Sequence, residues 1–299
     1  MPTPLLSVCL ITYNHQKYIR RAIEGVLVQK VNFDWEFIIA DDFSTDGTRA
    51  ILQEYQLKYP DRIKLILQEK NVGPAQNWFD LINAPESKYI AYFEGDDYWT
   101  DADKLQQQVD FLEANEHCSF CFHKAFKTKN DEIDPLSSYP RNIGKPVLNT
   151  SDFFKIPTIP TASIVYRNGI TFPQLDHSHG DYLLYCALLS KGSAGYIDKE
   201  MAVYRLHHQG VSSKYKENWY LERRINELNI EKNFPQFSND VRREISKLLV
   251  EHTLFYLNKN REKLTFSQKK YYTKLLMQSN FWFHATFKEI VTLAKTLLK

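Results

Sequence analysis

The sequence of 299 residues predicts an α/β fold built around a largely parallel β-sheet. Strand and helix patterns alternate four times within about the first 115 residues. Polar side chains follow three of these predicted strands, at Asn14, at Asp41-Asp42 and at Asp96-Asp97. Because ligands of such sheets bind beyond the carboxyl ends of the strands, these side chains predict one ligand-binding edge.

The first four strand–helix pairs each have a local cause in the sequence. The apolar runs 6–12, 37–40, 63–67 and 89–93 have the length of buried strands. Apolar residues at helical spacing over 19–27 predict the first helix. The turn Ser44–Thr48 opens a second helix, which Pro60 ends, and Pro74 suits the first turn of a third helix through Ile82.

The remaining elements are more widely spaced. Residues 104–113 and 181–191 predict helices, whereas 119–126, 163–167 and 202–206 predict strands. The stretch 128–162 is rich in Pro, Ser, Thr and Asn and predicts a loop. From about residue 217 the pattern is helical to the end. We therefore expect an α/β domain over residues 1–215 and a helical region over residues 216–299.

Composition excludes several classes of protein. The chain has 38 Lys and Arg against 36 Asp and Glu, a net charge of +2, so it lacks the basic signature of a nucleic-acid-binding protein. No apolar run approaches the roughly 18–20 residues of a membrane span, and no secretory signal opens the chain, so we expect a cytoplasmic protein. Cys118 and Cys121, with His123 nearby, have zinc-ligand spacing, but buried small side chains in a strand are the favoured interpretation.

The run Tyr89–Phe93 ends in Glu94, Gly95, Asp96 and Asp97. A buried strand that leads into three carboxylates needs a positive partner. Mg²⁺ and Mn²⁺ take oxygen ligands and usually share them with phosphate groups. This segment therefore predicts a divalent cation site that also holds a nucleotide.

Four ordered motifs resemble those of the family 2 glycosyltransferases, which have the GT-A fold. They are Ser7–Asn14, Ile39–Thr48, Asn71–Gly73 and Glu94–Asp97, and their order and spacing match over about residues 5–115. The resemblance implies a nucleotide-sugar half over about 1–115 and an acceptor half over about 116–215. It also implies inverting transfer of a sugar from a nucleotide donor with the help of a divalent metal.

The same resemblance implies roles for individual residues. Asp97 would bind the metal. Eight further residues would bind the nucleotide by contacting the base, the ribose or the metal's water shell: Thr12, Tyr13, Asn14, Asp41, Asp42, Asn71, Gly73 and Asp96. In a late motif His207 would reach the metal or the diphosphate, and its nitrogen would suit Mn²⁺ better than Mg²⁺. An ordinary surface histidine is the alternative for His207, and helix capping is the favoured interpretation of Asp46.

An inverting transfer needs a general base that removes the proton of the acceptor hydroxyl. Asp181 opens a predicted helix after Gly180, and the resemblance implies that the catalytic carboxylate of the family, which acts as this base, lies at that position. Helix capping is compatible with that role. Asp176 is the second candidate, and His177 and His179 would add polar groups near the acceptor.

The segment 261–299 is basic, with eight Lys or Arg and two Glu, and it interleaves aromatic and aliphatic residues. Such a pattern is typical of a helix that binds an anionic membrane surface. The alternative is a helix that packs on the catalytic domain or forms a homodimer contact.

Together these features predict a metal-dependent, inverting glycosyltransferase. We expect a UDP-sugar donor, Mn²⁺ or Mg²⁺, transfer of a hexose or N-acetylhexosamine, and a saccharide or lipid-linked saccharide acceptor in surface polysaccharide or glycolipid synthesis. A nucleotidyltransferase is one alternative, but it would need a Gly-rich, basic phosphate loop that Thr12–Gln16 lacks. A non-catalytic nucleotide-sugar-binding module is the other, and the intact Asp96, Asp97 and Asp181 argue against it.

Overall fold

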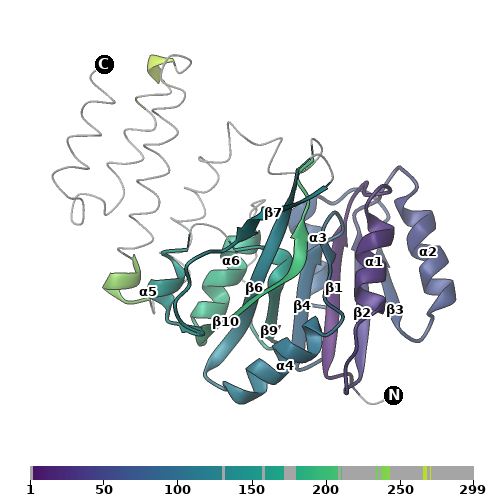
Figure 1. Cartoon of the computed structure of the whole chain (residues 1–299). Helices are drawn as coiled ribbons and strands as arrows, with labels where there is room; N and C mark the ends of the chain where they lie inside the picture. The colour runs from purple at the N-terminus through teal and green to yellow at the C-terminus, as the bar shows by residue number, and fades with distance from the viewer. Residues whose placement is uncertain are drawn as a thin grey trace.

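The structure is a computed structural model, and it describes residues 3–129, 132–156, 159–171, 180–207, 210, 234, 237–242, 265–267 and 270. One mixed sheet forms the centre of this part of the chain (Figure 1). Its strands are β1 (Leu6–Thr12), β2 (Trp35–Asp41), β3 (Ile63–Leu67), β4 (Tyr89–Glu94), β5 (Tyr98–Trp99), β6 (Cys118–Lys129), β7 (Glu132–Tyr139), β8 (Val147–Leu148), β9 (Ile164–Arg167) and β10 (Ser193–Tyr204).

The strand order is β3-β2-β1-β4-β9-β6-β10-β5, with β7 beside β6 and β8 beside β10. Strands β3, β2, β1 and β4 are parallel to one another. Strand β9 runs antiparallel to both β4 and β6, and β10 is parallel to β6. Strands β4, β6 and β10 therefore point the same way as β1 and β2. The prediction of a largely parallel α/β sheet is confirmed, and the carboxyl ends of these strands share one edge.

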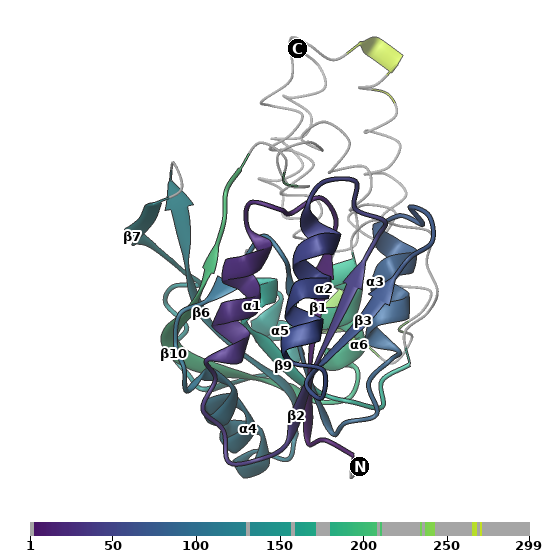
Figure 2. The ribbon, with the colours of Figure 1, turned by 90° about the vertical axis from the view of Figure 1, so that its right-hand side faces the viewer.

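Helices cover both faces of the sheet (Figure 2). They are α1 (Ile19–Leu27), α2 (Thr48–Lys58), α3 (Pro74–Ile82), α4 (Lys104–Ala114), α5 (Thr150–Phe153) and α6 (Gly180–Leu189). Side chains alternate along each strand, so Val8 and Leu10 pack towards α1, α2 and α4, whereas Cys9 packs towards α3 and α6. Because both faces are covered, the central strands are mostly apolar, and the buried Ser7 and Glu36 of β1 and β2 are paired by a hydrogen bond of 2.6 Å.

Two predictions for the second half of the chain are wrong. The stretch 128–162, predicted as a loop, contains β7, β8 and α5. Among the described strands β7 pairs with β6 alone, and an edge strand of this kind tolerates Pro135, which had argued for a loop. Strand β10 begins at Ser193, nine residues before the predicted start. Its register shifts between Ile197 and Ala202, and this irregularity hides the strand alternation in the sequence.

Residues 208–209 and nearly all of 211–299 lie outside the described residues, together with 172–179. The predicted helical region over 216–299, the domain boundary near 215 and the basic segment 261–299 therefore stay predictions. The same holds for Asp176, His177 and His179. Within the described ranges, no helix has the length and apolar character that a bilayer crossing requires.

Trp99, which follows the acidic residues, lies in the core. Its Nε1 donates to the carbonyl of Ala162 at 2.9 Å, and the Lys104 Nζ lies 3.9 Å from the centroid of its ring. Lys104 is fully buried and donates to the Gln108 Oε1 at 2.7 Å. Burial lowers the pKa of Lys104 to about 7, although Cys121 and Asp101 act in the opposite direction. Trp99 is therefore part of a rigid support for the acidic residues that precede it.

We predict that Lys104 makes stability depend on pH. The folded protein holds the Lys104 proton less tightly than the unfolded chain, in which the pKa is about 10.4. Below about pH 7 Lys104 is protonated in both states, and the buried ammonium destabilises the folded protein by its full amount. Between about pH 7 and pH 10 the folded protein loses this proton first, so the free energy of unfolding should rise by at most about 1.4 kcal/mol per pH unit. In Lys104→Met this rise should flatten when urea unfolding is measured across the range. The control Lys58→Met removes an exposed ammonium and should keep the wild-type slope. Equal slopes in all three proteins would contradict the account.

Candidate active site

The loops that follow β1 and β2 are held together by Asn14. The register pairs Thr12 with Asp41, so the two loops start side by side. The backbone N–H of Asn14 donates to the Ser44 Oγ at 2.8 Å, and its Oδ1 accepts from the Thr45 N–H at 2.8 Å. Asn14 has φ of 56°, a conformation that asparagine tolerates better than most residues. The geometry thus gives Asn14 a structural role, and Tyr13 beside it is 43% exposed.

Asp41 is enclosed by its own loop. Its side chain is inaccessible to solvent and accepts hydrogen bonds from the Ser44 hydroxyl and, at 2.6 Å, from the Arg49 Nε. A further bond comes from the Ser44 N–H at 3.0 Å. These partners lie within the protein, so Asp41 shapes the loop; its predicted contact with a nucleotide stays a prediction.

Asp42 joins the β2 loop to the turn before α3. Its carboxylate accepts from the N–H groups of Val72 and Gly73, at 2.7 and 3.1 Å, and its carbonyl accepts from the Asn71 Nδ2 at 3.1 Å. Gly73 has φ of 86°, a conformation that a side chain would strain. Burial, and then the charge of Asp41, raise the pKa of Asp42. The structure therefore brings Asp42, Asn71 and Gly73 together, and their predicted contact with a nucleotide stays a prediction.

The acidic segment after β4 turns tightly against β1. The Gly95 N–H donates to the Ile11 carbonyl at 2.9 Å, and a Cβ at Gly95 would lie only 3.0 Å from the Thr12 Oγ1. Thr12 is itself buried, and its Oγ1 lies 3.2 Å from the His15 Nδ1. Glu94 accepts from the Thr161 hydroxyl at 2.7 Å. A side chain at position 95 would crowd Thr12 and Ile19, so glycine suits this close approach, which places Asp96 and Asp97 at the shared edge.

Asp97 is the buried acid of the site. It is 1% exposed, and its Oδ1 accepts from the backbone N–H of Arg205 at 2.9 Å. Its Oδ2 is buried and has no hydrogen-bond partner within the described residues. Burial raises the pKa of Asp97 well above its ordinary value, and the charges of Asp96 and Glu94 add to the effect. A buried carboxylate oxygen without a partner is costly, so a positive ligand would stabilise it.

Two imidazole groups flank Asp96. The His207 Nε2 lies 2.9 Å from the Asp96 Oδ2, and the His15 Nε2 lies 3.9 Å from the same oxygen. Burial raises the pKa of Asp96, but the effects of His15 and His207 outweigh it and leave the pKa below its ordinary value. The structure places His207 against Asp96, and its predicted contact with the metal or the diphosphate stays a prediction. It also adds His15, which the sequence interpretation missed. Its position three residues after Thr12, at the same strand end, was the available signal.

Arg205 fixes the end of β10 to the acidic residues. Its Nη1 donates to the Asp96 carbonyl at 2.7 Å, in addition to the backbone bond to Asp97. Its guanidinium carbon lies 4.4 Å from the Tyr98 ring centroid and 5.2 Å from that of Tyr18. Burial lowers the pKa of Arg205, which still remains a cation. A permanent positive charge therefore stands next to the two aspartates.

The donor set of the site suits a hard divalent cation. The described ranges contain no group of three or more His, Cys, Asp or Glu that could enclose a metal ion by themselves. Mg²⁺ is usually bound through one or two carboxylates and takes its other ligands from phosphate and water. The unpartnered Oδ2 of Asp97 fits such a shared site. The zinc interpretation of Cys118 and Cys121 finds no support within these ranges, where both are buried free cysteines.

Two other predicted residues have simpler outcomes. Asp46 accepts from the Thr48 N–H at 2.9 Å and so orders the start of α2, although Gly47 is the residue directly before that helix. The backbone of Asp181 lies in the first turn of α6, immediately after Gly180. The side chain of Asp181 is outside the described structure, so its catalytic role stays a prediction.

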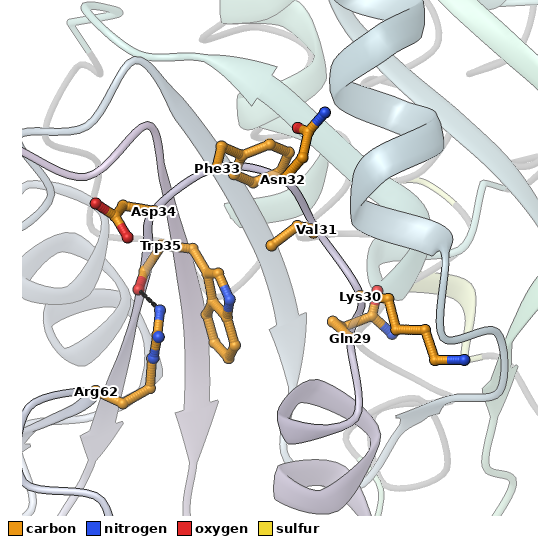
Figure 3. A pocket seen from close by; sticks show the side chains of 8 residues that line it. All are labelled: Gln29, Lys30, Val31, Asn32, Phe33, Asp34, Trp35 and Arg62. Carbon is orange, nitrogen blue, oxygen red and sulfur yellow. Dashed lines mark hydrogen bonds between the residues drawn. The ribbon is translucent and has the colours of Figure 1, made fainter.

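A shallow, open surface pocket of about 580 Å³ lies near the first residue of β2 (Figure 3). Trp35, at the start of β2, lines it together with Val31, Asp34 and Arg62. Strand β2 has seven residues, so about 20 Å separates this pocket from Asp41 at the other end of the strand. The pocket is therefore distinct from the acidic site.

Known proteins resemble this chain in sequence and in fold. An uncharacterized protein of Mycobacterium tuberculosis is 35% identical over 213 residues, which are 69% of this chain and 60% of the relative. TuaG of Bacillus subtilis, named as a teichuronic acid biosynthesis glycosyltransferase, is 30% identical over 240 residues, 77% of this chain and 91% of TuaG. WfaP of Escherichia coli, named as a UDP-Glc:alpha-D-GlcNAc-diphosphoundecaprenol beta-1,3-glucosyltransferase, is 30% identical over 219 residues, 71% of this chain and 82% of WfaP.

The chain thus spans about 60% of the length of the mycobacterial relative it matches. Among solved structures, a TarS fragment of S. aureus in complex with UDP superposes with a TM-score of 0.69 at 18% identity, over 98% of this chain and 90% of that one. At that identity the likeness concerns the fold alone, which is GT-A. Residues 7–171 match the family model for glycosyl transferase family 2, and the chain belongs to that family.

Proposed function

We propose that the chain is an inverting, metal-dependent glycosyltransferase that moves a sugar from a nucleoside diphosphate donor to a hydroxyl acceptor. The observation that carries the proposal is the buried Oδ2 of Asp97, which has no partner within the described residues. It lies at the carboxyl edge of the sheet, where α/β folds bind ligands. Family membership favours sugar transfer over nucleotidyl transfer and over binding without chemistry.

The donor we propose is a UDP-sugar. WfaP carries UDP-Glc in its name, and TarS has been solved with UDP and with UDP-GlcNAc. A mannosyltransferase of Pyrobaculum calidifontis, solved with GDP-Man and Mn²⁺, has a TM-score of 0.55 at 14% identity. These relatives support a nucleotide-sugar donor, and the mannosyltransferase supports Mn²⁺ as the metal.

In the proposed reaction the acceptor oxygen forms a bond to the anomeric carbon while the bond from that carbon to the diphosphate breaks. A bound Mn²⁺ or Mg²⁺ would neutralise charge on the departing diphosphate. Asp97 would hold the metal through Oδ2, and His207 and Asp96 would complete its surroundings. Arg205 adds a fixed positive charge beside them. The protein's contribution is therefore mainly positioning and charge stabilisation.

Asp181 is the general base that we propose for the acceptor. Its carboxylate would take the proton of the attacking hydroxyl, so that the proton leaves as the new bond forms. Its backbone position at the start of α6, preceded by Gly180, supports this role. The acceptor we propose is a saccharide or a lipid-linked saccharide, by analogy with the names of TuaG and WfaP. The basic segment 261–299 would then hold the enzyme near an anionic membrane surface.

The first test concerns the metal. In wild-type protein, calorimetric titration should show that Mn²⁺ tightens UDP binding and that EDTA removes the gain. In Asp97→Asn the affinity with Mn²⁺ should equal the affinity in EDTA, because the metal loses its carboxylate ligand. The control Asp61→Asn removes an exposed carboxylate from the turn after α2 and should bind as wild type. Metal-dependent tightening retained in Asp97→Asn would remove Asp97 from the metal site.

The second test concerns the base. Asp181→Asn should bind UDP and Mn²⁺ with near wild-type affinity but release UDP from a UDP-sugar and acceptor at least roughly 10²-fold more slowly. The amide keeps the size of the side chain and loses only its ability to accept the proton. Wild-type turnover in this variant would move the base elsewhere, and Asp176→Asn is the matched variant that would then be assayed.

A further inference from the structure

Phe43 has a strained backbone conformation that neither hydrogen bonds of its side chain nor full burial stabilise. Its φ is 60°, in the left-handed region, where a bulky side chain is a genuine outlier. Asn14 has a similar φ, but its side chain makes hydrogen bonds to the neighbouring loop. Phe43 gains neither such bonds nor full burial, since its side chain is 39% exposed. Strained residues that burial and hydrogen bonding do not stabilise are often found at functional sites, so Phe43 is a candidate for a functional role.

The surrounding loop forces Phe43 into this conformation. On one side Asp42 is tied to the turn before α3 through Val72 and Gly73. On the other side Ser44 is tied to Asp41 and to the Asn14 N–H. With both neighbours fixed, the ring of Phe43 is held at the carboxyl edge of the sheet.

Arg49 supports the ring of Phe43. Its guanidinium carbon lies 5.0 Å from the ring centroid. Arg49 is itself fixed, because its Nε donates to the Asp41 Oδ2 at 2.6 Å and its Nη2 donates to the Gln68 carbonyl. The ring therefore has a rigid cation on one side and solvent on part of the rest, which makes it a preformed flat apolar surface.

Tyr13 is a second exposed aromatic at the same edge. It directly follows Thr12, which pairs with Asp41 two residues before Phe43. Tyr13 is 43% exposed, and no ring contact joins it to Phe43 within the described ranges. Both flat surfaces are thus open to a planar ligand next to Asp42.

We propose that Phe43 is a donor-binding residue whose ring stacks on the base of the donor nucleotide. This inference rests on the proposed function, because it takes the ligand to be a nucleoside diphosphate. A base has an apolar π-face, and stacking on an aromatic side chain is a strong and geometrically simple way to hold it. Uracil is the base we commit to, because the donor proposed above is a UDP-sugar.

The test uses three substitutions at position 43 and measures UDP affinity and thermal stability. Phe43→Asn and Phe43→Gly accept the left-handed backbone but lack the ring, so they should bind UDP roughly 5- to 100-fold more weakly. Their midpoint temperatures should stay within about 2 °C of the wild type or exceed it, because the strain is relieved. Phe43→Trp keeps an aromatic face and should retain most of the affinity. The control Leu57→Ala removes an 84% exposed side chain from α2 and should change nothing.

The loss should have the same size with Mn²⁺ and with EDTA, because the ring contacts the base and not the diphosphate. Wild-type UDP affinity in Phe43→Asn would overturn the inference. So would a loss of binding that tracks a fall in stability, since that result belongs to a structural residue. If the wild type binds UDP but these variants do too, only this inference fails. If the wild type binds no nucleoside diphosphate, the proposed function fails as well.

Discussion

The junction between the end of β10 and the acidic residues after β4 is the interaction on which the site depends. Arg205 donates its backbone N–H to Asp97 and its guanidinium to the Asp96 carbonyl, and His207 reaches the side chain of Asp96. These residues are more than 100 positions apart in sequence. Strands β4 and β10 run in the same direction, so the topology brings their carboxyl ends to one edge. The sheet therefore assembles the site from two distant segments.

The same junction contains a buried carboxylate oxygen of Asp97 that destabilises the folded protein. A buried carboxylate normally has both oxygens paired, yet the Oδ2 of Asp97 has no partner in the described part of the chain. Next to it stands a fixed cation, Arg205, that uses its bonds on Asp96 and does not occupy this oxygen. The unpartnered Asp97 oxygen and the strained loop at Phe43 are both features that a bound ligand would stabilise. We interpret the local loss of stability as the cost of a preformed donor site.

The sequence predicted the helices and strands of the amino-terminal half well and those of the remaining described residues less well. Strands β1 and β3 have the predicted bounds, because apolar runs of strand length between turn residues leave little ambiguity. Strands β7 and the first part of β10 were missed, because an edge position and a register shift remove the alternation that reveals a strand. For the site, Asp42, Asn71 and Gly73 were assigned to one nucleotide-binding set by resemblance, and the structure joins them by hydrogen bonds, while their contact with a nucleotide stays a prediction. His15 was missed, and the enclosure of Asp41 by Arg49 was not foreseen, because both depend on contacts that only the folded loops create.

The central claim is that Asp97 is the metal-binding residue of a nucleotide-sugar site at the carboxyl edge of the sheet. The most direct test is a crystal structure of the protein with UDP and Mn²⁺, in which anomalous scattering locates the manganese. The account predicts a manganese peak about 2.0–2.3 Å from the Asp97 Oδ2, shared with the oxygens of the diphosphate. UDP in the pocket beside Trp35, or manganese on the diphosphate without Asp97, would contradict it.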